Sequence, residues 1–123
     1  MAFPVDEERI DAAERALGRP PPTALRKRLR RDNGGDLDLG EHGPWQLHPV
    51  WDDGDRRRAA RTAGHVVRET EAAREAVPDL PEGAVVVAAD GSGDLLLLLP
   101  DEDEPCRLDH ETGELESVAT DWA

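Results

Sequence analysis

Cysteine, aromatic residues and long apolar stretches are all scarce in this sequence. Of its 123 residues, one is cysteine, one is phenylalanine, three are tryptophan and none is tyrosine. A single cysteine, Cys106, allows neither an internal disulfide nor a cysteine-based metal framework. The longest apolar runs, residues 84–89 and 95–99, are far shorter than the roughly 20 residues that cross a membrane. The N-terminus lacks the charged and apolar regions of a secretory signal, so we expect a soluble cytoplasmic protein without membrane contact.

Basic residues are nearly missing from the last third of the chain. Residues 79–123 contain 13 acids and one base, Arg107, whereas residues 1–78 contain 15 acids and 14 bases. The formal net charge of −13 argues against non-specific nucleic-acid binding, which depends on neutralising phosphates. The acidic third has two interpretations. It is either a solvated surface that keeps the protein soluble, or an electrostatic face that steers and orients a basic partner.

The N-terminal part of the chain has the pattern of helices. Asp6 is placed to cap a first helix, and Gly18 to end it in a left-handed conformation. Between them the apolar residues share one helical face: Ile10, Ala13 and Leu17. After the prolines a second helix is expected, with Thr23 as the cap near its start. Two leucines are its apolar positions, and arginines, Arg28 among them, cover the rest of its surface. Asn33-Gly34-Gly35 stops that helix.

The remaining segments alternate between strand and helix patterns. Residues 36–51 indicate strands with turns, and residues 52–76 indicate a helix that Gly64 divides. Residues 84–89 and 94–99 flank a glycine-containing turn, which predicts a hairpin, and residues 105–109 and 114–118 predict the next arms. These elements favour one α+β domain over residues 1–123, with N-terminal helices packed on an antiparallel sheet that ends as a meander in the C-terminal half.

Local motifs for catalysis or cofactor binding are missing. The turn Asp90-Gly91-Ser92-Gly93 is followed by a strand and has no lysine, so a hairpin turn explains it better than a phosphate loop. The four histidines show no metal-binding spacing: His42, His48, His65 and His110. No nucleophile signature surrounds Ser92 or Cys106. We therefore expect no enzyme activity, no cofactor, no metal site and no small-molecule substrate.

Two further features have alternative interpretations. The acid cluster Asp101, Glu102, Asp103 and Glu104 lacks EF-hand spacing, and is either a solvated loop or a weak site for divalent cations. Among the tryptophans, Trp45 is expected in the core because an indole buries a large apolar area. Trp51, beside Asp52 and Asp53, is a candidate for an interface with a partner.

The order of four segments resembles the SUKH superfamily of Smi/Knr-type proteins. These segments read LGRPPPTALRKRLRRDNGG, WQLHPV, VVVAADGSGDLLLLL and LDHETGE, and they span most of the chain. The residues that carry the resemblance are Leu17, Gly18, Asn33, Gly34, Gly35, Trp45, Gly93 and Asp94. In the family these positions look structural, since the NGG ends a helix and the GD shapes a hairpin. The family often ends in a further helix, and here we expect Trp122 to supply part of that packing.

The resemblance implies an α+β fold and a function in protein binding. Many bacterial members are immunity proteins that neutralise polymorphic toxins, often nucleases, and such nucleases tend to be basic because they bind phosphate. The resemblance therefore predicts an immunity protein whose acidic face, residues 101–104 included, covers a basic toxin domain. The alternative is a regulatory or scaffold module that binds an endogenous partner, as the fungal cell-wall regulators of the superfamily are thought to do.

Overall fold

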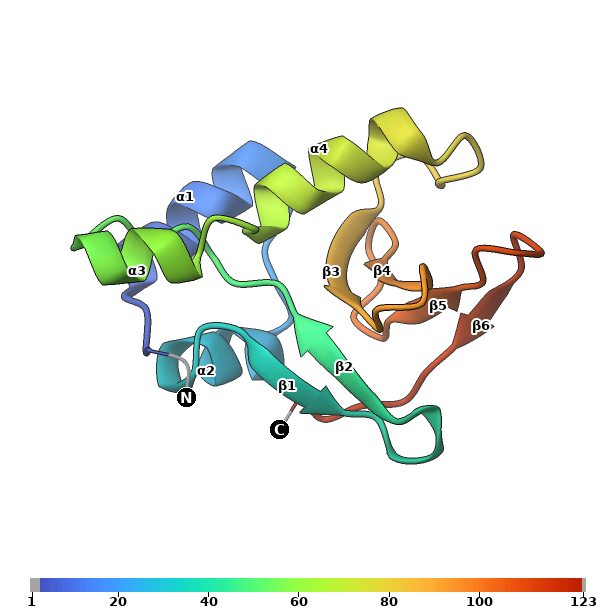
Figure 1. Cartoon of the computed structure of the whole chain (residues 1–123), viewed down its shortest axis with the longest axis horizontal. Coiled ribbons are helices and arrows are strands. Elements are labelled where there is room, and N and C mark those ends of the chain that lie inside the picture. The colour runs from blue at the N-terminus through green and yellow to red at the C-terminus, as the bar shows by residue number, and fades with distance from the viewer. Residues whose placement is uncertain (1–2, 123) are drawn as a thin grey trace.

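The computed structural model describes residues 3–122, which form helices around one antiparallel sheet (Figure 1). Two helices come first, two strands follow, two more helices come next, and four strands end the chain. The helices are α1 (Glu7–Leu17), α2 (Thr23–Arg31), the short 3-10 helix η1 (Gly40–His42), α3 (Arg56–Arg61) and α4 (Val66–Ala76). The strands are β1 (Gly35–Asp38), β2 (Pro44–Leu47), β3 (Val85–Ala89), β4 (Leu95–Leu98), β5 (Cys106–Leu108) and β6 (Leu115–Ser117).

The six strands pair in the order of the sequence, and every neighbouring pair is antiparallel. The expected α+β class is confirmed. The meander also extends further back than the C-terminal half, because Gln46 and Leu47 of β2 pair with Ala89 and Ala88 of β3. The whole segment that contains α3 and α4 is thus inserted between two adjacent strands.

Local capping signals explain where several helices begin and end. The carboxylate of Asp6 accepts a hydrogen bond from the Arg9 amide at 3.0 Å, and Gly18 takes the left-handed conformation with φ of 81°. The prediction that Thr23 caps α2 is wrong, since Pro22 holds the cap position and Thr23 is the first helical residue. The expected division of the third helix near Gly64 is confirmed by the gap between α3 and α4.

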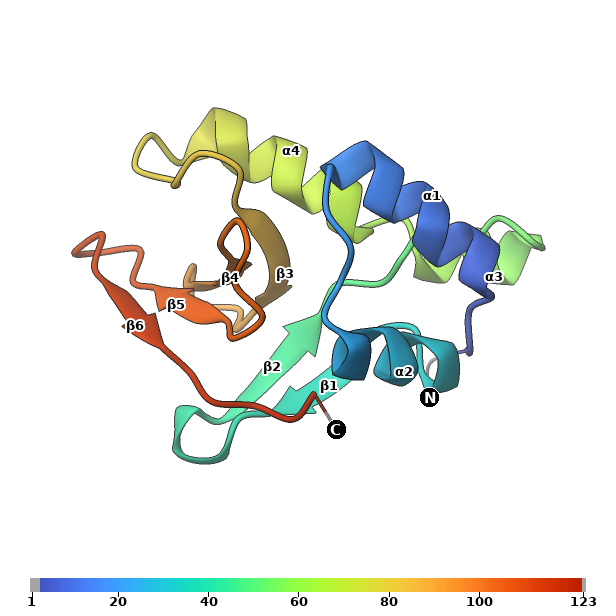
Figure 2. The same ribbon diagram turned by 180° about the vertical axis from the view of Figure 1, so that it is seen from behind.

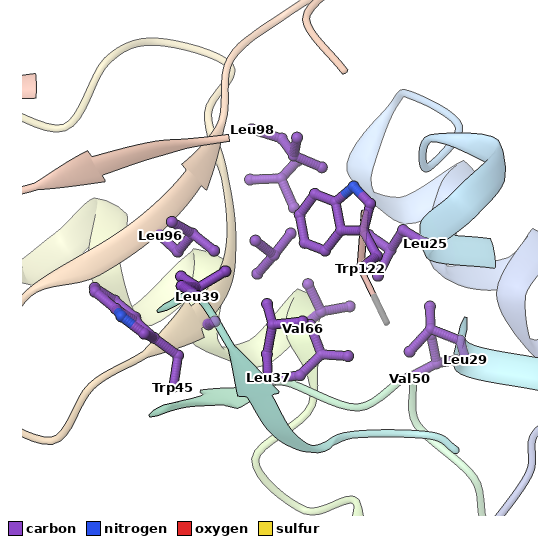
Figure 3. Packing of buried hydrophobic residues seen from close by; sticks show 14 of the residues in the cluster. Leu25, Leu29, Leu37, Leu39, Trp45, Val50, Val66, Leu96, Leu98 and Trp122 are labelled. Carbon is purple, nitrogen blue, oxygen red and sulfur yellow. The ribbon is translucent and has the colours of Figure 1, made fainter. Parts of the chain in front are cut away.

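Both faces of the two central strands are buried, which explains the two continuous apolar runs. One face belongs to a larger core cluster with the leucines of α2 and with Trp45 and Trp122. Figure 3 shows Trp45 beside Leu39 and Leu96, and Trp122 between Leu25 and Leu98. The opposite face forms a smaller cluster with α4: Ala73, Ala84, Val86, Leu97 and Leu108. As expected, Trp45 is a core residue, only 1% exposed.

The C-terminal segment supplies packing that a further helix would otherwise provide. It runs from β6 past β1 to α2, as Figures 1 and 2 show from two sides. The side chain of Trp122 is buried there, and its carbonyl accepts a hydrogen bond from Arg28 Nη1 at 3.4 Å. The expected contribution of Trp122 to the core is therefore confirmed.

Arg28 is buried, which corrects the prediction that it lies on the solvent-exposed side of α2. Its Nη2 donates to the carbonyl oxygens of Gly34 at 2.8 Å and Asp36 at 2.9 Å. Burial lowers the pKa of the guanidinium, but the ordinary value is so high that the group stays charged. The position follows Leu25 by three residues, so it lies on the apolar face of the helix.

Candidate interaction surface

Four exposed acids form the loop between β4 and β5, which we call the acidic loop: Asp101, Glu102, Asp103 and Glu104. Arg19, just after α1, fixes the shape of this loop. Its Nη1 donates to the carbonyl oxygens of Leu99 and Glu102, both at 2.8 Å, and its Nη2 lies 3.5 Å from the carboxylate of Asp103. Asp101 adopts a left-handed backbone with φ of 62°. The acids therefore project from a held loop.

Other acids of the last third surround the strands β4 to β6. The only base there, Arg107, is paired internally with Asp94 at 2.6 Å and Glu116 at 3.7 Å. Because β5 runs from the acidic loop to the next turn, the acids lie at both ends of these strands. Those that are exposed outside the acidic loop are Asp79, Glu82, Glu111, Glu114, Glu116 and Asp121.

The second predicted contact, around Trp51, lies between α1 and the start of α4. Trp51 is 42% exposed, and its ring centroid is 5.4 Å from that of His65. It borders a groove of about 510 Å³ that also includes Asp53 and Arg9. Asp53 is exposed and forms an ion pair with Arg9 at 3.1 Å. Trp51 and Asp53 are thus accessible to a partner.

Asp52 differs from its two neighbours because its carboxylate is buried. It lies 3.2 Å from Arg9 Nε and accepts a hydrogen bond from the Gly54 amide at 3.0 Å. Its own amide donates to the Thr62 hydroxyl at 3.0 Å. These bonds join α1, the loop between β2 and α3, and the C-terminal end of α3, so Asp52 supports the fold and leaves no carboxylate for a partner.

The structure does not bring the two predicted contacts together. Arg9 near the start of α1 holds Asp52 and Asp53, whereas Arg19 beyond its end holds the acidic loop. Ten helical residues rise about 15 Å, which is therefore the order of their separation. A single partner would need to span α1 to reach both.

The NGG segment joins the end of α2 to the loop that leads to Trp51. The side-chain amide of Asn33 donates to the carbonyl of Val50 and its oxygen accepts from the Val50 amide, both at 2.8 Å. Gly34 has a φ of 103°, and a Cβ there would lie 3.3 Å from the Leu47 carbonyl oxygen and from Pro49 Cβ. Both residues thus have packing roles in which a larger or apolar replacement fits poorly.

The GD segment anchors the turn between β5 and β6. Asp94 is buried, and its carboxylate accepts hydrogen bonds from Arg107 Nε and Nη2 at 2.9 and 2.6 Å. It also accepts the His110 amide at 3.1 Å and contacts His110 Nδ1 at 2.5 Å. A Cβ at Gly93 would lie 3.0 Å from the His110 ring, so glycine leaves the space that this ring occupies.

These contacts shift the pKa of both titrating partners. Burial raises the pKa of Asp94, but the hydrogen bonds from His110 and Arg107 outweigh it and bring that pKa down to about 2. The hydrogen bond to Asp94 raises the pKa of His110 above its ordinary 6.5. The pair is therefore most stabilising when Asp94 is charged and His110 is protonated.

We expect the Asp94 contacts to stabilise the fold most between about pH 4 and 6.5. Asp94 has a lowered pKa, so its contribution is present above its ordinary 3.8 and is lost as the pH falls through about 2. His110 has a raised pKa, so its contribution is complete below 6.5 and is lost as the pH rises through the raised value. The variant Asp94→Asn should lower the Tm by several degrees inside that range, and by less outside it. A Tm difference that does not vary with pH would contradict this expectation.

A metal site is not required to explain this cluster. Within residues 3–122, the group of three potential ligands that lie within 4.8 Å of one another is Asp94, Asp109 and His110. Arg107 already holds one oxygen of Asp94 at 2.6 Å, and His110 holds the other. A cation would have to displace these partners, so the arrangement is an ion-paired anchor.

Several residues that shape the surface carry no local sequence signal. Arg19, Arg107 and His110 act on partners that are distant in the sequence, and sequence reasoning assigned none of these contacts. Arg28 is the exception, since its spacing from Leu25 places it on the buried side of α2.

No helix in the part of the chain that the structure describes has the length and apolar character needed to cross a membrane.

The order of elements, with helices before β1 and again between β2 and β3 of one meander, defines an α+β domain. The chain belongs to the SMI1/KNR4 family (SUKH-1), whose sequence profile it matches over residues 4–123. Members are in general non-enzymatic immunity or regulator proteins that bind protein partners. Neither the comparison with curated proteins nor that with solved structures finds a match.

Proposed function

We propose that this chain is a cytoplasmic immunity protein of the bacterial type, which binds and neutralises a basic toxin domain such as a nuclease. The observation that carries the proposal is the acidic loop, where four exposed acids are held in place by Arg19. A nuclease needs a basic surface to bind phosphate, and an acidic protein surface is complementary to it. Trp51 and Asp53 provide a second, smaller contact at the other end of α1.

Recovery of the partner is the experiment that tests this proposal. The tagged chain would be isolated from its own cells, and the bound proteins identified by mass spectrometry. A single basic toxin domain, recovered in stoichiometric amount and released by high salt, is the expected result. Recovery of housekeeping proteins would instead favour the regulatory module, and a toxin gene next to the gene for this chain would support immunity independently.

We expect neutralisation of the acidic loop to slow association with that partner by about tenfold or more at low salt. The variant carries Asp101→Asn, Glu102→Gln, Asp103→Asn and Glu104→Gln, and asparagine tolerates the left-handed backbone at position 101. The matched control changes the same charge at four exposed acids elsewhere: Glu7, Glu41, Glu71 and Glu75 to Gln. Stopped-flow association rates for both variants, measured across a salt series, check the result. Equal rates for both variants would show that the acidic loop is not the contact.

A further inference from the structure

The outer edge of β6 has backbone groups without a strand partner. Glu114 and Val118 face β5, since the Glu114 carbonyl accepts from the Asp109 amide at 3.0 Å and the Val118 amide donates to Pro105 at 2.9 Å. Backbone direction alternates along an antiparallel strand. The N–H and C=O groups of Leu115 and Ser117 therefore point away from the sheet, and β6 is the last strand within residues 3–122.

The opposite edge of the sheet is covered, so the open edge is specific to β6. Along β1, Arg28 occupies the carbonyl oxygens of Gly34 and Asp36, and the segment that ends at Trp122 passes alongside. Figure 1 shows β6 at the end of the sheet that lies away from α1 and α2, and no strand lies beyond it among residues 3–122. The fold thus protects one edge and exposes the other.

The side chains of β6 define what this edge accepts. Leu115 is 45% exposed, a high value for a large apolar side chain. It lies between Glu114 and Glu116, both exposed. Arg107 on β5 lies opposite Glu116 and 3.7 Å from its carboxylate, and His42 Nε2 lies 3.9 Å from the same carboxylate. Glu116 is thus partly neutralised, and Glu114 carries most of the negative charge that a partner would meet.

The same charges disfavour a second copy of this chain as the occupant. A two-fold axis at Leu115 would set Glu114 opposite Glu116 of the other copy, and an axis at Glu116 would set that residue against itself. Like charges directly opposite each other destabilise a strand pair. An extended segment with basic residues beside an apolar one has the complementary pattern.

We infer that β6 is a docking edge, which takes up an extended basic segment of a protein partner as a seventh strand. Main-chain hydrogen bonds from Leu115 and Ser117 would hold the segment, an apolar side chain would cover Leu115, and its lysines or arginines would meet the glutamates. The inference rests on the proposed function in so far as the partner is a basic protein. It adds a third contact to the acidic loop and the Trp51 region, and this one is defined by backbone geometry as well as by charge.

The test uses a synthetic peptide as the probe. It alternates lysine and valine over about six residues, a common strand length, and both ends are blocked. The full chain is titrated at low salt and followed by amide NMR and hydrogen exchange. We expect binding that slows exchange at the amides of Leu115 and Ser117. N-methylation of alternate peptide amides should weaken binding by about tenfold or more, since it removes main-chain donors at constant charge.

The variant Ser117→Pro separates strand addition from charge attraction. It removes an outward N–H without touching the bonds to β5, and Glu116 already has the extended backbone that precedes proline. Binding should fall about tenfold or more, while the matched control Ser117→Ala binds normally. Unchanged binding by Ser117→Pro, or no binding of the peptide at all, would overturn the inference and leave the acids as protection against edge aggregation. A recovered toxin that binds Ser117→Pro at full strength would overturn it too, while the proposed function would stand.

Discussion

Replacing Trp122 by alanine is expected to lower the free energy of unfolding by about 4 kcal/mol, the usual cost of deleting a fully buried indole. The ring is 3% exposed and packs between α2 and β4, beside Leu25 and Leu98 (Figure 3). No helix follows β6 within the described residues to fill the space. Urea denaturation, with the slope compared between variants, measures the loss.

Two further variants show whether the loss comes from the ring. Trp122 has a φ of 64°, which is strained for any side chain but free for glycine. Trp122→Gly should therefore be no less stable than Trp122→Ala, although glycine normally costs backbone entropy. Trp51→Ala is the matched control because that ring is 42% exposed, and it should cost less than 1 kcal/mol. Equal losses at Trp51 and Trp122 would contradict the structure.

The second large effect is expected at Asn33, where alanine should cost about 3 kcal/mol. The side chain satisfies both the amide and the carbonyl of Val50, and all of these groups are buried. Truncation leaves two backbone groups without partners, and each carries a desolvation cost of about 1–3 kcal/mol. Denaturation at neutral pH measures the loss.

Asn33→Asp tests the donor half of this contact separately. The carboxylate still accepts from the Val50 amide, but its second oxygen faces the Val50 carbonyl, so both atoms are acceptors. We expect the variant to be as unstable as Asn33→Ala at neutral pH and to recover stability on acidification, as the carboxyl gains a proton. Gln46→Ala is the control, since the side chain of Gln46 is exposed and donates to Asp36 at the surface, and it should change stability by less than about 0.5 kcal/mol.

The features that sequence predicted well are those with short-range causes. Asp6 and Gly18 act within one turn of α1, and the glycine turn after residue 89 joins two apolar runs that only a hairpin brings together. Residues 36–51 were expected as strands with turns, and they contain β1 and β2. The second strand ends near His48, because Pro49 and Val50 leave the sheet and bond to α4 and to Asn33.

Long-range partners explain what sequence could not predict. Asn33 was expected to end a helix, but its side chain bonds to Val50, 17 residues away. Asp94 was expected to shape its own hairpin, but it binds Arg107 and His110 of the next one. No periodicity or spacing encodes such pairs, because they depend on how the strands are placed.

The candidate surface shows the same division. The charge asymmetry was evident from composition, and four consecutive acids marked the acidic loop. Its support by Arg19 was not predictable, because the bonds go to backbone carbonyls about 80 residues away. Asp52 is buried although Trp51 and Asp53 are exposed, because its carboxylate is paired with Arg9 of α1, which is also distant in the sequence.

The insertion of α3 and α4 between adjacent strands has a consequence for the order of folding. Only residues 90–94 separate β3 from β4, whereas residues 48–84 separate β2 from β3. Closing the longer loop costs about 2 kcal/mol more in chain entropy. We therefore expect β3 to β6 to form early and β1 and β2 to join later, so that the two apolar runs shield each other before the helices cover them. In pulsed hydrogen exchange, the amides of Leu96 and Leu97 should gain protection before the amide of His48, which donates to the Val87 carbonyl across the junction of β2 and β3.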